Sequence, residues 1–257
     1  MSRIFPIAYN TYREAVRDRV LYNLIVFALL IVGSALLFGQ ISISIERIVL
    51  INMGLSSISI FGIVISIFIG ISLVWKEIDR RTLYTVLAHP VRRWEFIFGK
   101  YLGLVGTLTL NALFMAIGFF AALLYLSHSF ARPDVYLLVA IYFILLQFTM
   151  MTAVALLYST YSSPLLSSIF AFSTFVIGTF SEDLHDFAAG AHGVTKWVMT
   201  SVAYLIPNFS SLNVISHVAH GTPVSGALVV QNTLYAITYS LVVLLCAAAI
   251  FENRNFK

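Results

Sequence analysis

The feature that most constrains this chain is a set of six long windows without a single charged side chain. They comprise residues 21–39, 55–75, 104–126, 136–158, 164–180 and 228–250, which are 19, 21, 23, 23, 17 and 23 residues long. A helix that crosses the hydrocarbon core of a bilayer needs about 20 residues, within a range of about 17–25. It also satisfies its own backbone hydrogen bonds there. The windows therefore predict an all-α, polytopic membrane protein with six transmembrane helices.

The composition agrees with this interpretation. Hydrophobic residues make up 60% of the chain and charged residues 10%, with a mean hydropathy of +0.94. Soluble domains carry about 25% charged residues, so a soluble globular enzyme, a disordered protein and a disulfide scaffold are excluded. The single cysteine, Cys246, lies in the last window and can form no intramolecular disulfide. Without repeats or low-complexity runs, residues 1–257 are predicted to form a single transmembrane domain.

Basic residues are distributed unequally over the connecting segments. The N-terminal segment, the connection between the second and third windows, and the C-terminal tail hold twelve of the 15 Lys and Arg residues. The connections on the other side hold only Arg47, Arg132 and Lys196. Cytoplasmic segments are enriched in Lys and Arg. We therefore expect both termini in the cytoplasm, a multi-pass protein of the cell inner (plasma) membrane, and no nucleic acid as partner.

The segment before the first window is predicted to be an amphipathic helix over residues 3–19. Its apolar residues recur at roughly helical spacing: Ile4, Ile7, Ala8, Tyr12, Ala15, Val16 and Val20. Arg13, Glu14, Arg17 and Asp18 occupy much of the other side. Such a helix fits the cytoplasmic membrane interface, although a plain polar flank to the first span is the alternative. No cleavage site follows the first apolar run, so we expect that span to stay as an anchor.

Two connecting segments are predicted to contain structure of their own. Residues 76–103 are the most polar stretch, and Pro90 should end one short helix and begin another, giving a cytoplasmic helix–turn–helix. Residues 181–227 form the longest connection, on the outer side. There Val194–Ile206 and Ser211–His220 look like two short helices divided by Pro207 and Asn208. Helices this short cannot span a bilayer, so we expect re-entrant or interfacial pieces.

Signatures of catalysis are absent from the sequence. It has no phosphate-binding loop, no H-E-x-x-H, no paired-cysteine metal spacing and no G-x-S-x-G elbow. The six windows also lack Asp, Glu, Lys, Arg and His, which argues against an ion-coupled transporter. We therefore predict no catalytic residue, no bound cofactor and no metal ligand. An intramembrane enzyme using His89 or the outer histidines has no supporting constellation.

Polar residues elsewhere have ordinary explanations. The windows contain neutral polar side chains that we expect to form hydrogen bonds between helices: Asn111, Gln147, Thr149, Thr152 and Thr174. The outer connection contains Glu182, Asp183, His185, Asp186, His192, His217 and His220. A metal site there is conceivable, but no spacing is diagnostic and solvated loop residues are the favoured interpretation.

The polar segment around Pro90 resembles the coupling segment of type-2 ABC transporter permeases. The matching residues run through Glu77-Ile-Asp79-Arg80-Arg81-Thr82-Leu83, Leu87-Ala-His89-Pro90-Val91-Arg92-Arg93-Trp94-Glu95 and Gly99-Lys100-Tyr101-Leu102-Gly103. In that family an acidic residue, a Thr-Leu pair, a Pro-Val turn, an arginine and a Gly-Lys pair recur in this order. The N-terminal helix resembles the family's elbow helix. Leu205-Ile206-Pro207-Asn208-Phe209 and the tail Phe251-Glu252-Asn253-Arg254-Asn255-Phe256 also agree.

The resemblance is greatest to the subgroup linked to multi-copper enzyme maturation and nitrous-oxide-reductase assembly. It implies that the chain is a permease subunit without its own ATPase site, in the lipid bilayer with a second permease chain as homodimer or heterodimer. Separate ABC ATPase subunits would bind the ATP, and the complete transporter would be an exporter. The chain departs from copper handling because it has no Cys or Met cluster, which Cu(I) favours. The implied ATPase-coupling residues are Glu77, Arg80, Arg81, Thr82, Leu87, Pro90, Arg93, Trp94, Glu95, Gly99 and Lys100.

A second function remains open at this point. The chain could be a non-transporting membrane scaffold or assembly subunit that docks a periplasmic partner through residues 181–227. Both hypotheses predict binding of an ATPase. ATP turnover that responds to a candidate substrate separates them, because only a transporter has a cargo to couple.

Overall fold

The computed structural model describes residues 4–18, 22, 25–26, 29–34, 46–79, 93–127, 134–190 and 192–253. Over these ranges all regular structure is helical, which confirms the predicted all-α class. The elements are α1 (Ile4–Val16), α3 (Glu46–Asp79), α5 (Arg93–Ser127), α6 (Val135–Tyr161), α7 (Pro164–Thr179), α8 (Ser181–Gly190), α9 (Val194–Leu205), the 3-10 helix η2 (Ser210–Leu212), α10 (Ile215–Ala219) and α11 (Gly226–Asn253).

Four of the described helices, α3, α5, α6 and α11, are long and apolar enough to cross a membrane. A fifth span results if α7 and residues 181–188 form one span that bends by 71°. These helices contain the predicted windows from 55–75 onward. The window 21–39 lies largely outside the described residues, so the sixth span stays a prediction. At 1.5 Å per residue, the 34 residues of α3 extend over about 50 Å and project beyond a core of about 30 Å.

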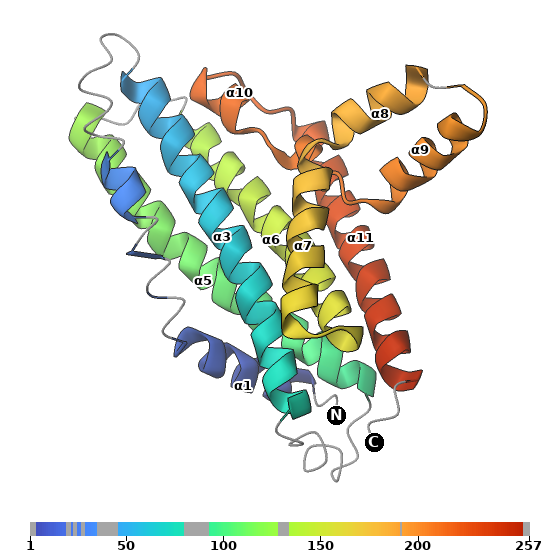
Figure 1. The fold of residues 1–257 in the computed structure, drawn as a ribbon. Helices are drawn as coiled ribbons and strands as arrows, with labels where there is room; N and C mark the ends of the chain where they lie inside the picture. Colours follow the sequence, from blue (N-terminus) through green and yellow to red (C-terminus); the bar gives the residue numbers. More distant parts are fainter. Residues whose placement is uncertain are drawn as a thin grey trace.

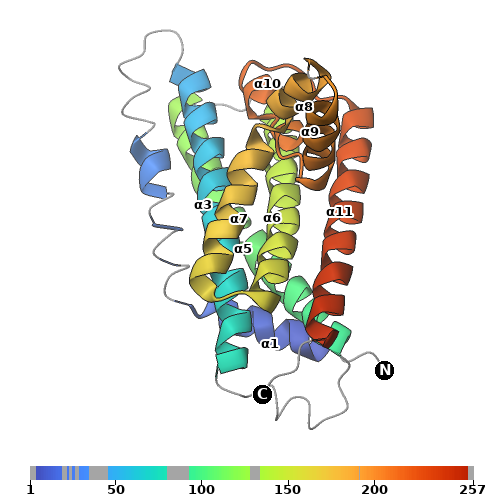
Figure 2. The ribbon, with the colours of Figure 1, turned by 45° about the vertical axis from the view of Figure 1, so that its right-hand side comes forward.

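The elements gather at two opposite ends of the bundle. Helix α1 lies across one end, where α3 finishes, α5 begins and α11 finishes (Figures 1 and 2). Helices α8, α9 and α10 lie at the other end (Figure 1). The described parts of the segments that the basic residues assigned to one side of the membrane are therefore together at one end of the bundle. We refer to these as the α1 end and the α8 end.

Helix α6 occupies the centre of the bundle and contacts α3, α5, α7 and α11. Of its apolar window 72% is buried, against 33% for α11. A helix that is apolar on all sides is suited to such a central place. Small residues such as Ala140, Ala153 and Ala155, all fully buried, let its neighbours approach closely.

The contact between α3 and α6 combines small residues with buried hydrogen bonds. A Cβ on Gly62 would lie 1.8 Å from Cζ of Phe148, so the ring packs directly on the glycine backbone. Ser59 donates to Oε1 of Gln147 at 2.8 Å. The hydroxyls of Ser66 and Thr152 are 2.9 Å apart. Glycine contacts and interhelical hydrogen bonds are the two means by which helices associate in lipid.

The predicted interhelical role of the neutral polar residues is confirmed for Gln147, Thr152 and Thr174, whose hydroxyl lies 2.8 Å from that of Tyr158. Thr149 donates to the carbonyl of Leu146 in its own helix, and its side chain also forms a hydrogen bond with Tyr101 of α5. The buried Nδ2 of Asn111 finds no hydrogen-bond partner among the described residues.

The outer connection contains more helix than expected. Helix α9 and the short α10 confirm the two predicted helices, whereas α8 was not predicted. It follows α7 after one residue, Phe180, and carries Glu182 and Asp183 in its first turn. Acidic residues there interact favourably with the helix dipole. The charge that suggested a solvated loop thus also favours a helix start.

Candidate functional site

The predicted coupling residues divide into two groups. Arg80, Arg81, Thr82, Leu87 and Pro90 lie outside the described residues, and with them the turn of the predicted helix–turn–helix. Glu77 belongs to the last turn of α3 and Arg93 opens α5, but their side chains are also outside the description. Trp94, Glu95, Gly99 and Lys100 lie in the first turns of α5. The helix that begins at Arg93 runs without a break into the third predicted span, as expected.

Gly99 and Gly103 near the start of α5 let α1 pack directly on the backbone of α5, and we call this contact the glycine seat of α1. A Cβ on Gly99 would lie 2.7 Å from Cγ2 of Ile7. A Cβ on Gly103 would lie 2.5 Å from the carbonyl oxygen of Ala8 and 2.6 Å from Cβ of Thr11. All three distances are too short for real contacts, so only glycine permits this approach of the two helices. The Gly-Lys-x-x-Gly pattern noticed in the sequence is therefore a helix-packing site.

Between these glycines, Lys100 points into the contact with α1 and is only 1% exposed. Its Nζ lies 4.0 Å from Oε2 of Glu14 in α1. It also lies 5.7 Å from the centroid of the Phe96 ring. A buried ammonium needs such partners, because its desolvation is costly. Charge and packing thus attach α1 to α5 at the same place.

The C-terminal end of α11 is attached to the same turns of α5. The rings of Phe96 and Phe251 stack with centroids 5.7 Å apart and an interplanar angle of 12°. Both side chains are buried. In contrast, Trp94, two residues before Phe96, is 41% exposed and meets Phe98 edge-on with ring centroids 6.1 Å apart. The first turns of α5 therefore join α1 and α11 and still present an aromatic side chain at the surface.

At the α8 end, the motif over residues 205–209 forms a hydrogen-bonded junction centred on Asn208. Its Oδ1 accepts from the hydroxyl of Ser181 at 2.6 Å and from the backbone N–H of Ser211 at 2.9 Å. Its own N–H donates to the hydroxyl of Tyr235 at 2.8 Å. One asparagine thus connects α8, the turn before η2 and α11.

Neighbouring contacts fix the same junction to the spanning helices. The N–H of Phe209 donates to the carbonyl of Gly178 at 3.0 Å, and the Phe209 ring is buried. A Cβ on Gly178 would lie 2.4 Å from the carbonyl oxygen of Pro207. Nδ2 of Asn232 in α11 donates to the carbonyl of Ser211. The sequence motif is therefore explained by structure: it holds the outer connection against α7 and α11.

An ion pair joins the beginnings of α3 and α6 at this end. Arg47 donates to the carboxylate of Asp134, which is 6% exposed. Across the part of the chain that the structure describes, no group of three His, Cys, Asp or Glu residues could hold a metal ion.

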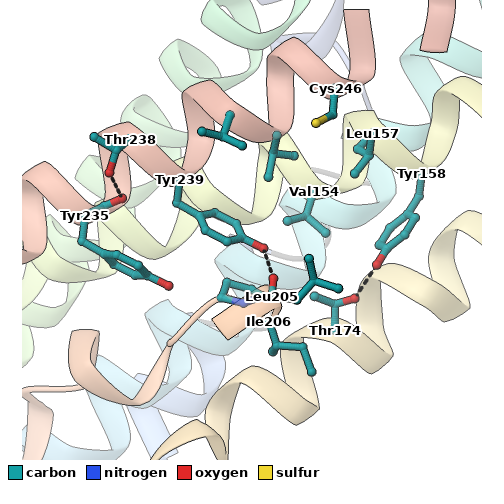
Figure 3. A pocket seen from close by; sticks show the side chains of 13 residues that line it. Val154, Leu157, Tyr158, Thr174, Leu205, Ile206, Tyr235, Thr238, Tyr239 and Cys246 are labelled. Carbon is teal, nitrogen blue, oxygen red and sulfur yellow. Dashed lines mark hydrogen bonds between the residues drawn. The ribbon is translucent and has the colours of Figure 1, made fainter. Parts of the chain in front are cut away.

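A cavity of about 530 Å³ lies between α6, α7, α11 and residues 205–207. Figure 3 shows the side chains that surround it. Hydroxyl groups at its edge are bonded within the protein: Tyr158 to Thr174 at 2.8 Å, and Tyr239 to the carbonyl of Leu205 at 3.2 Å. No local sequence pattern indicates this cavity, because its lining residues are scattered between residues 154 and 246.

These features define a multi-pass membrane protein with long apolar helices. Packing contacts and hydrogen bonds hold the helices together at both ends of the bundle. The model of the ABC-2 family transporter proteins matches residues 5–256. The chain belongs to this family, whose members are permease components of ABC transporters. The comparison with curated proteins gave no match. The predicted class is confirmed, and the narrower resemblance to permeases of copper-enzyme maturation stays a prediction.

Proposed function

We propose that this chain is the permease subunit of an ATP-binding cassette exporter that a separate ATPase drives. The observation that carries the proposal is the family match over residues 5–256, nearly the whole chain. The sequence contains no phosphate-binding loop, so the ATP site belongs to the partner. Permeases of this family work with ATPase subunits and dimerise, and a second permease chain completes the transporter.

The α1 end is the proposed docking end of the ATPase and faces the cytoplasm. Twelve of 15 basic residues belong to the segments that connect at this end, as expected for the cytoplasmic side of an inner membrane. Residues 76–100 would receive the movement of the ATPase. Exposed Trp94 is suited to a direct contact, whereas buried Gly99 and Lys100 would act through α1.

Two contacts would carry the movement of α5 to other helices. The glycine seat and the Lys100–Glu14 pair connect α5 to α1. The stacked rings of Phe96 and Phe251 connect α5 to α11, which lines the cavity. Packed interfaces transmit displacement because they are close-packed and resist compression. A rotation of α5 would therefore move α1 and the cavity wall together.

Reconstitution with the partner ATPase tests this function. Trp94→Ala should reduce recovery of the complex and cargo-dependent ATP turnover. Tyr125→Ala, an exposed aromatic at the far end of α5, should leave both unchanged. The chain alone should show no specific ATP photolabelling. Failure of any ABC ATPase to copurify with the chain from gently solubilised membranes would overturn the proposal.

The scaffold function has one observation in its favour. Helices α8 and α9 form a hairpin that projects from the bundle, and α9 packs chiefly on α8 (Figure 1). Val194 and Trp197 on α9 are 79% and 78% exposed. A periplasmic partner could dock there. Cargo-stimulated ATP turnover that survives Trp197→Ala favours the exporter, and turnover insensitive to every cargo favours the scaffold.

A further inference from the structure

The cavity between α6, α7 and α11 has a wall of aliphatic side chains at the depth of the spanning helices. Val154 and Leu157 contribute from α6, and Val242 and Val243 from α11. Its volume of about 530 Å³ falls in the range of about 300–1,000 Å³ that is typical of ligand pockets. The cavity is therefore large enough for a flexible apolar group.

The polar groups of the lining do not call for a polar ligand. The hydroxyls of Tyr158 and Thr174 form a hydrogen bond with each other, and the hydroxyl of Tyr239 donates to the carbonyl of Leu205. Thr238 donates to the carbonyl of Leu234 in its own helix. Among the described residues, no Asp, Glu, Lys, Arg or His lines the cavity. A charged group placed there would lose its hydration without gaining a partner, so the interior selects against charge.

The cavity also opens to the outside of the bundle. Val242 and Leu205 line it and are nevertheless 57% and 79% exposed. Next to them, Leu241 and Leu245 continue an exposed apolar surface along α11. In a transmembrane helix such a surface faces lipid chains. A hydrocarbon chain could therefore enter the cavity sideways from the bilayer without passing a polar barrier.

We propose that this cavity binds the acyl chain of an amphipathic molecule, which enters from the membrane between α11 and residues 205–207. The acyl chain belongs either to a bilayer lipid or to an amphipathic cargo. Binding of the acyl chain needs no ATPase, whereas the assignment of that acyl chain to cargo rests on the proposed transport function. Because Phe251 at the end of α11 stacks on Phe96 of α5, a displacement of α5 at the α1 end would also move α11 and so alter the cavity wall.

Photolabelling tests the site on the full chain in nanodiscs. The probe is a phospholipid with a diazirine near the end of one acyl chain, and the labelled peptides are mapped by mass spectrometry. We expect labelling of peptides that contain Leu157 and Cys246, which both line the cavity (Figure 3). Val242→Trp should reduce this labelling several-fold because the indole fills the opening.

The matched control is Leu241→Trp, because Leu241 is the adjacent residue on α11, is 48% exposed and does not line the cavity. It should label as the wild type does. Thr238→Trp provides a second filling variant in case the first does not fold. Labelling that is spread evenly over α7 and α11, or that neither filling variant reduces, overturns the proposal.

A second measurement shows whether the bound acyl chain belongs to a lipid or to cargo. In the complex with its ATPase, turnover is measured with and without an added long-chain amphiphile. Stimulation that Val242→Trp removes and Leu241→Trp keeps assigns the site to cargo. Photolabelling without stimulation assigns it to a bilayer lipid. If no ATPase partner exists, the proposed function fails while the photolabelling result still decides whether the cavity holds an acyl chain.

Discussion

The ring of Phe96 in α5 lies nearly parallel to the ring of Phe251 in α11, with the centroids 5.7 Å apart. This pair brings together residues separated by most of the membrane domain in sequence. One turn further along α5, Gly99 and Lys100 hold α1. Three elements therefore meet within the first turns of α5, beside the segment that we propose to receive the ATPase.

Phe251→Ala should loosen the end of α11. Removing a buried phenyl ring typically costs about 3–5 kcal/mol in protein cores. We expect a clear fall in the thermal unfolding midpoint in detergent. Phe114→Ala removes the same ring from a position on α5 that is 52% exposed, and should have little effect. Equal midpoints for the two variants would contradict the structural role of the Phe96–Phe251 stack.

Gly103→Ala should displace α1 from α5. The added methyl would lie 2.5 Å from the backbone oxygen of Ala8, and overpacking of this kind costs about 1–3 kcal/mol. Gly106→Ala is the matched control, because its methyl would meet Cδ2 of Tyr12 at an ordinary 3.7 Å. Amide hydrogen exchange of residues 4–16 measures the effect. Exchange should accelerate only in Gly103→Ala, and equal exchange in both variants would disprove the close contact.

Gly62→Ala should disrupt the pairing of α3 and α6, since Cζ of Phe148 occupies the place of the new methyl. Phe148→Leu removes the clashing ring atoms. The double variant should therefore be more stable than Gly62→Ala alone, although neither substitution is favourable by itself. Thermal unfolding of the two single variants and the double variant measures this coupling. Additive losses would show that the two residues do not touch.

Asn208→Ala should weaken the junction at the α8 end. Two hydrogen bonds to its Oδ1 are lost, each worth about 0.5–1.5 kcal/mol. Asn213→Ala is the control in the same connection, because Asn213 is exposed and accepts one long bond from Ile215 at 3.4 Å. Limited proteolysis of residues 181–225 should accelerate for Asn208→Ala. If both variants resist the protease like the wild type, Asn208 is no organising residue.

The α8 end should be accessible from outside the cytoplasm. A cysteine at exposed Ser201 on α9, in a Cys246→Ala background, should react with an impermeant maleimide added to spheroplasts. A cysteine at Tyr9 on α1, 60% exposed, should react only after the membrane is ruptured. The opposite pattern would reverse the proposed topology.

Much of the architecture was predictable from local sequence. The uncharged windows from 55–75 onward coincide with long helices, because an apolar run of membrane length has few other ways to satisfy its backbone. The two short outer helices were also found. Helix α8 was missed because three acidic residues in ten suggested a loop, although two of them favour a helix start.

The candidate sites were less predictable, because their residues come together only through packing. Gly99, Lys100 and the motif around Asn208 were recognised as a pattern, but not as the seat of α1 and the outer junction. The sequence also placed Lys100 among the ATPase-coupling residues without indicating that it is buried beside Glu14. Burial depends on a neighbouring helix that the local pattern does not specify.

The sequence by itself determined the class of protein, the positions of most spans and the unequal distribution of basic residues over the connecting segments, since hydropathy and charge act locally on each segment. Only the tertiary structure decided that α5 joins α1 and α11, that Asn208 connects α8 and α11, and that a cavity remains beside α6. These relationships depend on the shapes of side chains from distant segments, such as Phe96 and Phe251, and no single segment contains that information.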